Sequence, residues 1–166
     1  MMSNVINLFI VDEAVYPTTS KLNDEQTYQA LIDITQDEAT RWQSIELNMR
    51  AFIPAIELLD AVVGGQGLLP VSTFHYYPHK LIGPDANISG SFGFFSSEMV
   101  QDLFPLLEKY FEVDIENSEN KALVDSIEHR AGELDPQAYE IVRDRYFVTF
   151  RDASKQNKSI VVLIEE

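Results

Sequence analysis

The order of apolar and polar residues predicts a chain with a short buried strand near each end and helices over much of the length between. The mostly apolar run Val5–Val11 is typical of a buried strand. A second apolar run, Ile160–Ile164, predicts another strand near the other end. We expect these two strands to pair with each other or with a strand from the middle of the chain.

Two helices are predicted in the first half. Asn23-Asp24-Glu25 indicates a helix start, because a capping side chain precedes acids at the positive helix end. The buried face of that helix would be Tyr28, Leu31, Ile32 and Ile34. Steps of three and four predict a longer helix through Trp42, Ile45, Met49, Phe52, Ile53, Ile56, Leu59 and Val63. Pro54 should kink or divide it, and Gly64-Gly65 should end it.

Three more helices are predicted in the second half. Ser96-Ser97-Glu98 opens the first, and Pro105 inside it favours a bend or a break. The second runs from about Asn120 to Arg130 and is closed by Gly132. Asp135-Pro136, an N-cap followed by proline at the first helical position, opens a third that runs to about Gln156. Its buried face would be Tyr139, Val142, Tyr146, Phe150 and Ala153.

These elements predict an α+β (mixed α/β) fold, in which a helix-rich single domain spans residues 1–166 and a small sheet includes the N- and C-terminal strands. The length of 166 residues fits one domain, and 45% apolar residues are enough for a core. Cysteine is absent, which excludes disulfides, thiolate metal sites and cysteine nucleophiles. The first residues carry no basic segment or cleavage site, and no apolar run is long enough for a membrane span, so we expect a cytoplasmic protein.

The net charge narrows the choice of partners. Asp and Glu number 27 against 12 Lys and Arg, which gives −15. Nucleic acids and anionic membranes are poor partners, because affinity for them depends on cationic side chains that neutralise phosphates. A basic protein would be attracted instead. The plainer interpretation is that the charge serves solubility only.

The most acidic segment is a candidate binding surface. Its members, around the predicted end of one helix and the start of the next, are Glu108, Glu112, Asp114, Glu116 and Glu119. They lack calcium-loop spacing and a central glycine, so they are not predicted to bind calcium. They form either a solvated face or a docking surface for a basic partner.

A second candidate site lies in the segment from Gln66 to Gly93, which is rich in Gly, Pro and aromatic residues. We interpret this segment as a long loop that is interrupted by a strand over Val71–Tyr77. Its polar and aromatic candidates are His75, Tyr76, Tyr77, His79 and Asp85. Two histidines four apart would share a zinc ion on a helix, whereas on a strand they lie about 13 Å apart. A turn at Pro78 would bring them together, but the aromatic context favours two partly exposed polar groups, so no metal site is predicted there.

The remaining motifs have structural interpretations. His129 lies near a helix end, where an imidazole interacts with the helix dipole. Gly64-Gly65-Gln66-Gly67 follows a helix and lacks the Lys-Ser/Thr ending, so it indicates a helix cap rather than a phosphate loop. No Gly-x-Ser-x-Gly pattern follows a strand. The sequence predicts no catalytic residues and no cofactor.

Three segments resemble the uncharacterised bacterial YfbM-like proteins. They are the aromatic-glycine turn and helix start Phe92–Val100, the end of the last helix with its terminal strand, Phe150–Ile164, and the segment Ala61–Gly65. The resemblance implies a fold class and a bacterial origin. It implies no reaction and no site residues.

The leading hypothesis is a cytosolic bacterial protein that binds a protein partner through an acidic surface, as toxin-neutralising immunity proteins do. One alternative is a small enzyme or ligand binder that uses the aromatic and histidine loop of residues 74–95. Another is a homo-oligomeric structural protein whose apolar stripes are buried against a second copy.

Overall fold

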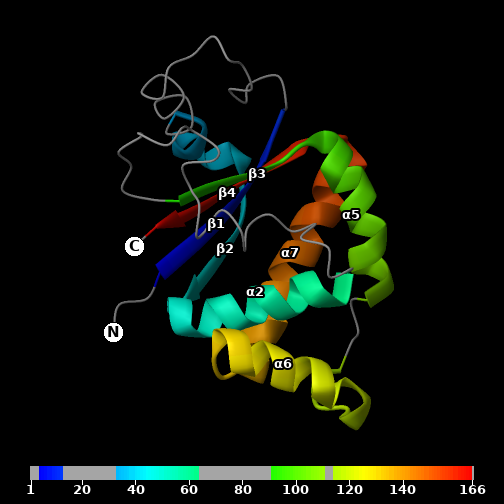
Figure 1. The fold of residues 1–166 in the computed structure, drawn as a ribbon. Coiled ribbons are helices and arrows are strands. Elements are labelled where there is room, and N and C mark those ends of the chain that lie inside the picture. The colour runs from blue at the N-terminus through cyan, green and yellow to red at the C-terminus, as the bar shows by residue number, and fades with distance from the viewer. Residues whose placement is uncertain (1–3, 13–32, 64–90, 111–113, 166) are drawn as a thin grey trace.

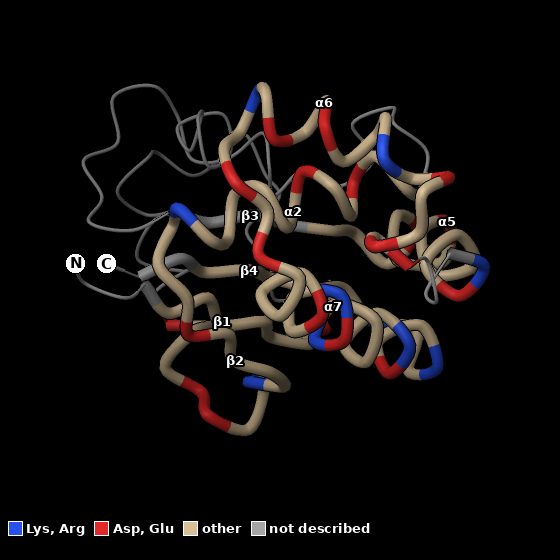
Figure 2. Tube along the Cα trace, turned by 90° about the horizontal axis from the view of Figure 1, so that it is seen from below, with Lys and Arg blue, Asp and Glu red and all other residues tan. Residues whose placement is uncertain are grey.

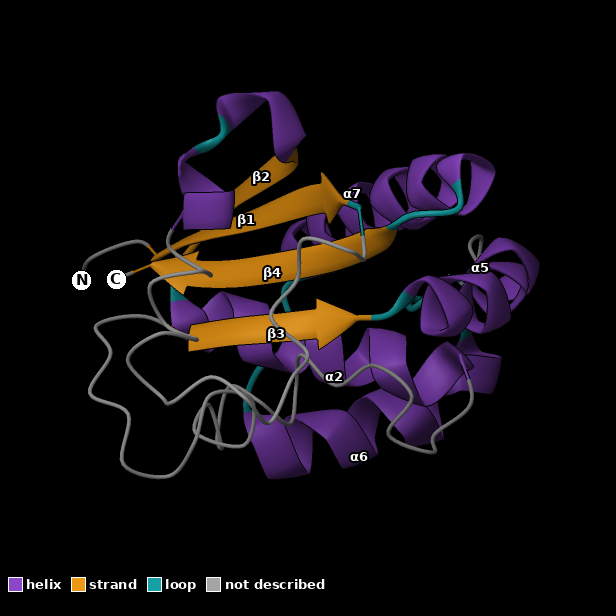
Figure 3. Cartoon of the chain, turned by 90° about the horizontal axis from the view of Figure 1, so that it is seen from above, coloured by secondary structure: helices purple, strands orange, loops and turns teal. Residues whose placement is uncertain are grey.

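A four-stranded antiparallel sheet forms the centre of the computed structural model, which describes residues 4–12, 33–63, 91–110 and 114–165 (Figure 1). Its strands are β1 (Asn4–Val11), β2 (Arg41–Leu47), β3 (Ser91–Phe95) and β4 (Ser159–Glu165). They lie side by side in the order β2-β1-β4-β3 (Figure 3). The two terminal strands are therefore the inner pair of the sheet.

Strands β1 and β4 pair directly, as the sequence predicts, with a register from Val5 opposite Glu165 to Val11 opposite Ser159. The hydroxyl of Ser159 donates to the carbonyl of Val11 at 2.9 Å. Alternate residues of both strands point to opposite faces. Each face of this pair is buried, which explains why both strands appear as apolar runs rather than as an alternation.

Four long helices of the described ranges accompany the sheet: α2 (Met49–Val63), α5 (Ser97–Tyr110), α6 (Lys121–Ala131) and α7 (Pro136–Gln156). Helix α7 contacts β1, β2 and β4 and packs between α2 and α5, while α6 packs on α2 (Figure 1). One apolar core joins the helices to one face of the sheet. Short 3₁₀ helices, η2 (Glu38–Thr40) and η3 (Ser118–Asn120), precede β2 and α6. The predicted helix-rich α+β fold with both terminal strands in the sheet is confirmed.

Helix α7 forms where the sequence predicts it. The Asp135 carboxylate accepts a hydrogen bond from the Gln137 backbone N–H at 2.9 Å, and Pro136 occupies the first turn. All five residues of its predicted apolar face are buried. The helix ends at Asn157, whose left-handed conformation (φ 54°) terminates the chain of helical hydrogen bonds. Local signals at both ends therefore place this helix accurately.

The long helix predicted through Trp42 and Ile45 is wrong over its first part, because residues 41–47 form β2 and the helix starts only at Met49. The side chain of Asn48 causes the change: it accepts a hydrogen bond from the Ala51 N–H at 2.9 Å and so caps the helix. Trp42 and Ile45 of the strand continue the three- and four-residue spacing of the helix by coincidence, and the predicted helix therefore begins too early. A register shift in β2, where Leu8 is opposite Gln43 and Phe9 opposite Arg41, leaves Trp42 as the extra residue of a β-bulge.

The other helix predictions have mixed outcomes. Helix α6 and its closure by Gly132 (φ 106°) are confirmed, as is the start of α5, where the Ser96 hydroxyl accepts from the Met99 N–H at 3.1 Å. Pro54 and Pro105 both lie inside helices that continue past them, so neither proline divides its helix. Of the helix predicted from Asn23, only residues 33–36 are described, and they are helical. Gly64-Gly65 and the possible strand Val71–Tyr77 lie outside the described residues.

Candidate functional site

The predicted acidic surface lies where α5 is connected to α6. Glu108 is in the last turn of α5, and Asp114, Glu116 and Glu119 follow in the connection and in η3; all four are exposed. Glu112, the fifth predicted member, lies outside the described residues. We call the four described residues the acidic connection.

Hydrogen bonds hold the acidic connection in a defined shape. The Asp114 carboxylate accepts from the Glu116 N–H at 2.9 Å, and the Asn117 side chain accepts from the Glu119 N–H at 3.0 Å. The Asn120 amide donates to the carbonyl of Asp114 at 2.6 Å. Two successive turns are thus closed by side chains, which keeps the carboxylates of Glu116 and Glu119 in water.

Within the described part of the chain, none of the four carboxylates of the acidic connection forms an ion pair. The bases that do form ion pairs engage other acids; they are Arg41, Lys121, Arg130, Arg143 and Arg151. Lys121 follows the connection, and its hydrogen bond to Asp125 at 2.8 Å raises the pKa of the ammonium. Asp and Glu residues occur along all four labelled helices (Figure 2).

The residues of the other predicted site, His75, Tyr76, Tyr77, His79 and Asp85, lie outside the described residues. His129 is exposed in the last turn of α6, as expected for an imidazole near a helix C-terminus. In the described ranges, no three His, Asp or Glu side chains are grouped closely enough to hold a metal ion.

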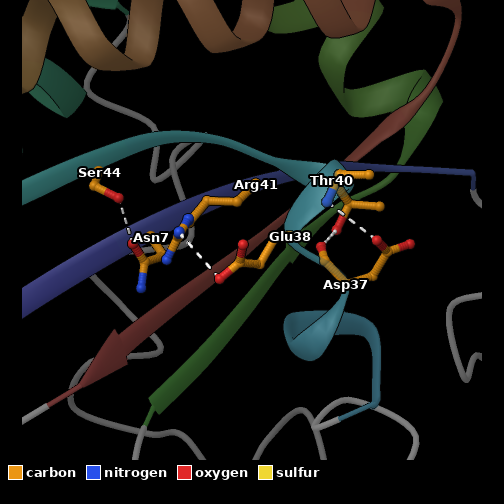
Figure 4. A network of polar contacts seen from close by, with 7 residues as sticks. Asn7, Asp37, Glu38, Thr40, Arg41 and Ser44 are labelled. Atoms are coloured by element: carbon orange, nitrogen blue, oxygen red, sulfur yellow. Dashed lines mark hydrogen bonds and ion pairs between the residues drawn. The ribbon is translucent and has the colours of Figure 1, made fainter.

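A cavity of about 520 Å³ lies at the end of β1, and sequence reasoning missed it. Its walls combine apolar and charged side chains: Ile10, Val11, Asp12, Asp33, Ile34, Asp37, Thr40 and Lys158. The Thr40 hydroxyl donates to the Asp37 carbonyl at 2.7 Å, and the Asp37 carboxylate accepts from the Ala39 N–H at 3.1 Å (Figure 4). Asp37 therefore acts as the cap of η2. In the sequence, only Asp12, the acid that directly follows the first apolar strand, indicates a polar group at this place.

A second cavity of about 360 Å³ lies where the first turns of α2 and α7 meet. It is lined by Asn48, Arg50, Ala51, Glu133, Leu134, Asp135 and Pro136. The caps Asn48 and Asp135 already accept hydrogen bonds from the two helix starts. The lining carries the acids Glu133 and Asp135 and the base Arg50, so its charges favour neither an anionic nor a strongly cationic ligand.

Two polar contacts join β2 and α5 to the C-terminal half of α7. The Trp42 indole N–H donates to the Asp152 carboxylate at 2.6 Å, and Arg151 donates to the other oxygen at 3.0 Å. Partial burial by itself raises the pKa of Asp152, but these hydrogen bonds and the charges of Arg151 and Lys155 outweigh it and hold that pKa below 3.8. Gln101 and Ser154 form the corresponding link between α5 and α7.

Two tyrosines of α7 place their hydroxyls in the core. In the described structure, neither the Tyr139 nor the Tyr146 hydroxyl has a hydrogen-bond partner. Burial raises the pKa of Tyr139 to about 12, although the nearby Arg143 lowers it, and burial raises that of Tyr146 further. Both phenols therefore stay neutral and serve the core as rings.

Comparison with known proteins gives a structural likeness. No family model and no curated protein matches the chain. Among solved structures, the crystal structure of YfbM from Escherichia coli, described as a protein of unknown function, is similar. The similarity covers 98% of this chain and 99% of that chain, with 12% identity and a TM-score of 0.44. YfbM gives its name to the YfbM-like proteins that three segments of the sequence resemble.

In the described residues, no helix is both long and apolar enough to cross a membrane.

Proposed function

We propose that this protein is a binding module that recognises a basic protein partner through the acidic connection between α5 and α6. The observation that carries the proposal is the exposure of Glu108, Asp114, Glu116 and Glu119 without an ion pair among the described residues. A neutralising partner would gain favourable electrostatic energy without first breaking internal ion pairs. The fixed turns reduce the entropy lost when a partner orders this surface.

The charge of the whole molecule supports the same partner class. A net charge of −15 raises the rate of encounter with a cationic protein, and the acidic connection supplies the local contact. A basic toxin in the bacterial cytoplasm is the finer form of this proposal, with the chain as its immunity-type partner. This form agrees with the absence of any predicted catalytic group in the sequence.

The experiment compares two sets of three substitutions that change the net charge equally. One set, Glu108→Gln, Glu116→Gln and Glu119→Gln, alters the acidic connection. The control set, Glu46→Gln, Asp102→Asn and Glu133→Gln, alters exposed acids on other elements or at other positions. Binding to purified basic proteins encoded beside the gene is measured by biolayer interferometry between about 50 and 500 mM salt, where screening becomes strong.

We expect the first set to weaken binding at least about tenfold and to flatten its dependence on salt, because it removes local charge contacts. The control set should change the association rate modestly. Equal effects of the two sets would reduce the proposal to general electrostatic attraction and so contradict it. Binding that ignores salt would also contradict it.

Two alternatives from the sequence stay predictions. The ligand binder or small enzyme would use His75, Tyr76, Tyr77, His79 and Asp85, and metal analysis with a thermal-shift screen of small molecules tests it. Light scattering tests the homo-oligomeric alternative.

A further inference from the structure

The cavity at the end of β1 has the size of a site for a small organic molecule. Its volume is about 520 Å³, and such sites in proteins measure about 300–1,000 Å³. Three segments that are distant in sequence line it: the end of β1, residues 33–40 before β2, and Lys158 between α7 and β4. The cavity shares no residue with the acidic connection, so it is independent of the partner surface proposed above.

The lining contains an apolar part. Ile10 and Val11 of β1 are 3% and 1% exposed, and Ile34 is half-buried. Small-molecule sites combine apolar residues of this kind with a few polar groups that fix the orientation of the ligand. The three aliphatic residues therefore suit the hydrocarbon chain of a ligand.

The base in the lining is Lys158, which is half-buried. Within the ranges that the structure describes, its ammonium forms no ion pair. Its backbone is fixed, because its N–H donates to the Ala153 carbonyl at 3.0 Å and the next residue, Ser159, is bonded to Val11. A partly desolvated ammonium held at this place would gain from a carboxylate supplied by a ligand.

The acids in the lining are three aspartates. The Oδ1 atom of Asp37 accepts from the Ala39 N–H at 3.1 Å, and the Thr40 hydroxyl donates to the Asp37 carbonyl at 2.7 Å, which fixes this segment (Figure 4). Asp12 and Asp33 are exposed and contribute two more carboxylates. Three aspartates and one lysine give the lining a charge of −2, which favours a ligand with more positive than negative groups.

We propose that this cavity binds a basic amino acid of the lysine type. The carboxylate of the ligand pairs with the Lys158 ammonium. Its two ammonium groups are neutralised by the aspartates of the lining, with Asp37 in a direct contact. Its aliphatic chain packs on Ile10, Val11 and Ile34.

Each simpler ligand leaves part of the lining unmatched. An anion without an ammonium group is repelled by the three aspartates. A diamine provides no counter-ion for Lys158, and an apolar molecule would desolvate the charged groups without compensation. The net charge of −15 also attracts a ligand whose own charge is positive.

A series of three compounds tests the ligand class. L-Lysine is the probe, norleucine is the same amino acid without the side-chain ammonium, and cadaverine is the same chain without the carboxylate. Isothermal titration calorimetry measures each up to about 10 mM, which includes millimolar affinities. We expect lysine to bind at least about tenfold more tightly than either analogue. Absence of lysine binding overturns the proposal, as does equal affinity of lysine and either analogue.

Nuclear magnetic resonance tests the location. In ¹H–¹⁵N spectra, lysine should shift the backbone amides of Val11, Thr40 and Lys158 more than those of the acidic connection. Binding with the largest shifts at other elements overturns the assignment of the cavity.

Lys158→Met tests the carboxylate contact, because it removes the ammonium and keeps an unbranched side chain. It should weaken lysine binding at least about tenfold, as loss of a charge-assisted contact does, and leave cadaverine binding near its wild-type value. Lys155→Met is the matched control, since Lys155 is an exposed lysine of α7 outside the lining. Equal effects of the two substitutions contradict the proposal, and so does an equal loss of both ligands in Lys158→Met.

Asp37→Asn tests the ammonium contact. The amide keeps an oxygen for the Ala39 N–H, so the turn is retained while the charge is lost. Binding of lysine and of cadaverine should both weaken at least about tenfold. Asp125→Asn, at an exposed acid of α6 outside the cavity, changes the net charge equally and should leave both unchanged. Circular dichroism confirms that each variant is folded, and equal effects of the two aspartate variants overturn the proposal.

Discussion

Trp42 and Asp152, 110 residues apart in sequence, are joined by a 2.6 Å hydrogen bond from the indole nitrogen to the carboxylate. The bulge in β2 gives the indole its direction toward α7, since an extra residue in a strand changes where its side chains point. Arg151 holds the other carboxylate oxygen at 3.0 Å. This one contact connects an edge strand of the sheet to the longest helix described.

Acid should report on this contact. The pKa of Asp152 is lower in the folded protein than the ordinary value of 3.8. The contact therefore contributes stability at pH values above the ordinary pKa of an Asp carboxyl, and this contribution is lost as the pH falls through the lowered pKa of the folded protein. We expect Trp42 emission to change with a midpoint below 3.8, and Asp152→Asn to remove that transition. Fluorescence titration of both proteins checks this. A midpoint at or above 3.8 would show that the carboxylate is not stabilised in its charged form.

The buried hydroxyl of Tyr146 should cost stability. It has no hydrogen-bond partner in the described structure, and the side chain is fully buried. Tyr146→Phe should raise the free energy of unfolding by about 1 kcal/mol, because the desolvation penalty disappears. Thermal melting should rise by about 2–4 °C for a chain of this size.

Ser159→Ala is the matched control for that substitution. Its hydroxyl is equally buried but donates to Val11 at 2.9 Å, so its removal should lower the free energy of unfolding by about 1 kcal/mol. Urea unfolding compares the two variants. The expectation for Tyr146 fails if both substitutions destabilise the protein by similar amounts.

Phe150 should be among the most sensitive core positions. It is fully buried, and its ring lies 5.0 Å from that of Phe95 and 6.2 Å from that of Tyr146. Phe150→Ala should lower the free energy of unfolding by about 3–5 kcal/mol, because a cavity replaces a packed ring. Phe147→Ala, at a half-buried position of the same helix, should cost clearly less. Chemical denaturation of both variants gives the comparison, and equal losses would argue against this description of the core.

The cap of α7 gives a smaller, local effect. Asp135→Ala removes the acceptor for the Gln137 N–H and should lower the free energy of unfolding by about 1 kcal/mol. Asp135→Asn keeps an acceptor and should recover most of that loss. Equilibrium unfolding in urea measures both. An asparagine variant as unstable as the alanine variant would mean that the charge, rather than the cap, stabilises the helix start.

The sequence predicts those elements whose signals are local. Asp135-Pro136 fixes the start of α7, and the apolar runs fix β1 and β4, because each signal acts within a few residues. The error at β2 has the same origin: Trp42 and Ile45 continue a helical rhythm by chance, and only the capping side chain of Asn48 marks the boundary.

Contacts between distant segments were not predictable in this way. The cavity at the end of β1 brings Asp12 together with Asp37 and Lys158, and only the folded sheet does so. The acidic connection is predicted as a candidate surface because its members are close in sequence, whereas the turns that shape it depend on hydrogen bonds of the Asp114 and Asn117 side chains that only the folded structure shows.

The position of β4 has a consequence for biosynthesis. The inner pair of strands joins Val5 to Glu165, so the middle of the sheet cannot assemble until the ribosome has released nearly all the residues described. During translation, β1 can pair with β2 on one edge, but its other edge has no partner until β4 has been synthesised. Closing so long a loop is slow, and an apolar strand with one open edge is prone to aggregation meanwhile. Yield in the cell should therefore depend on chaperones that shield the nascent N-terminal strand.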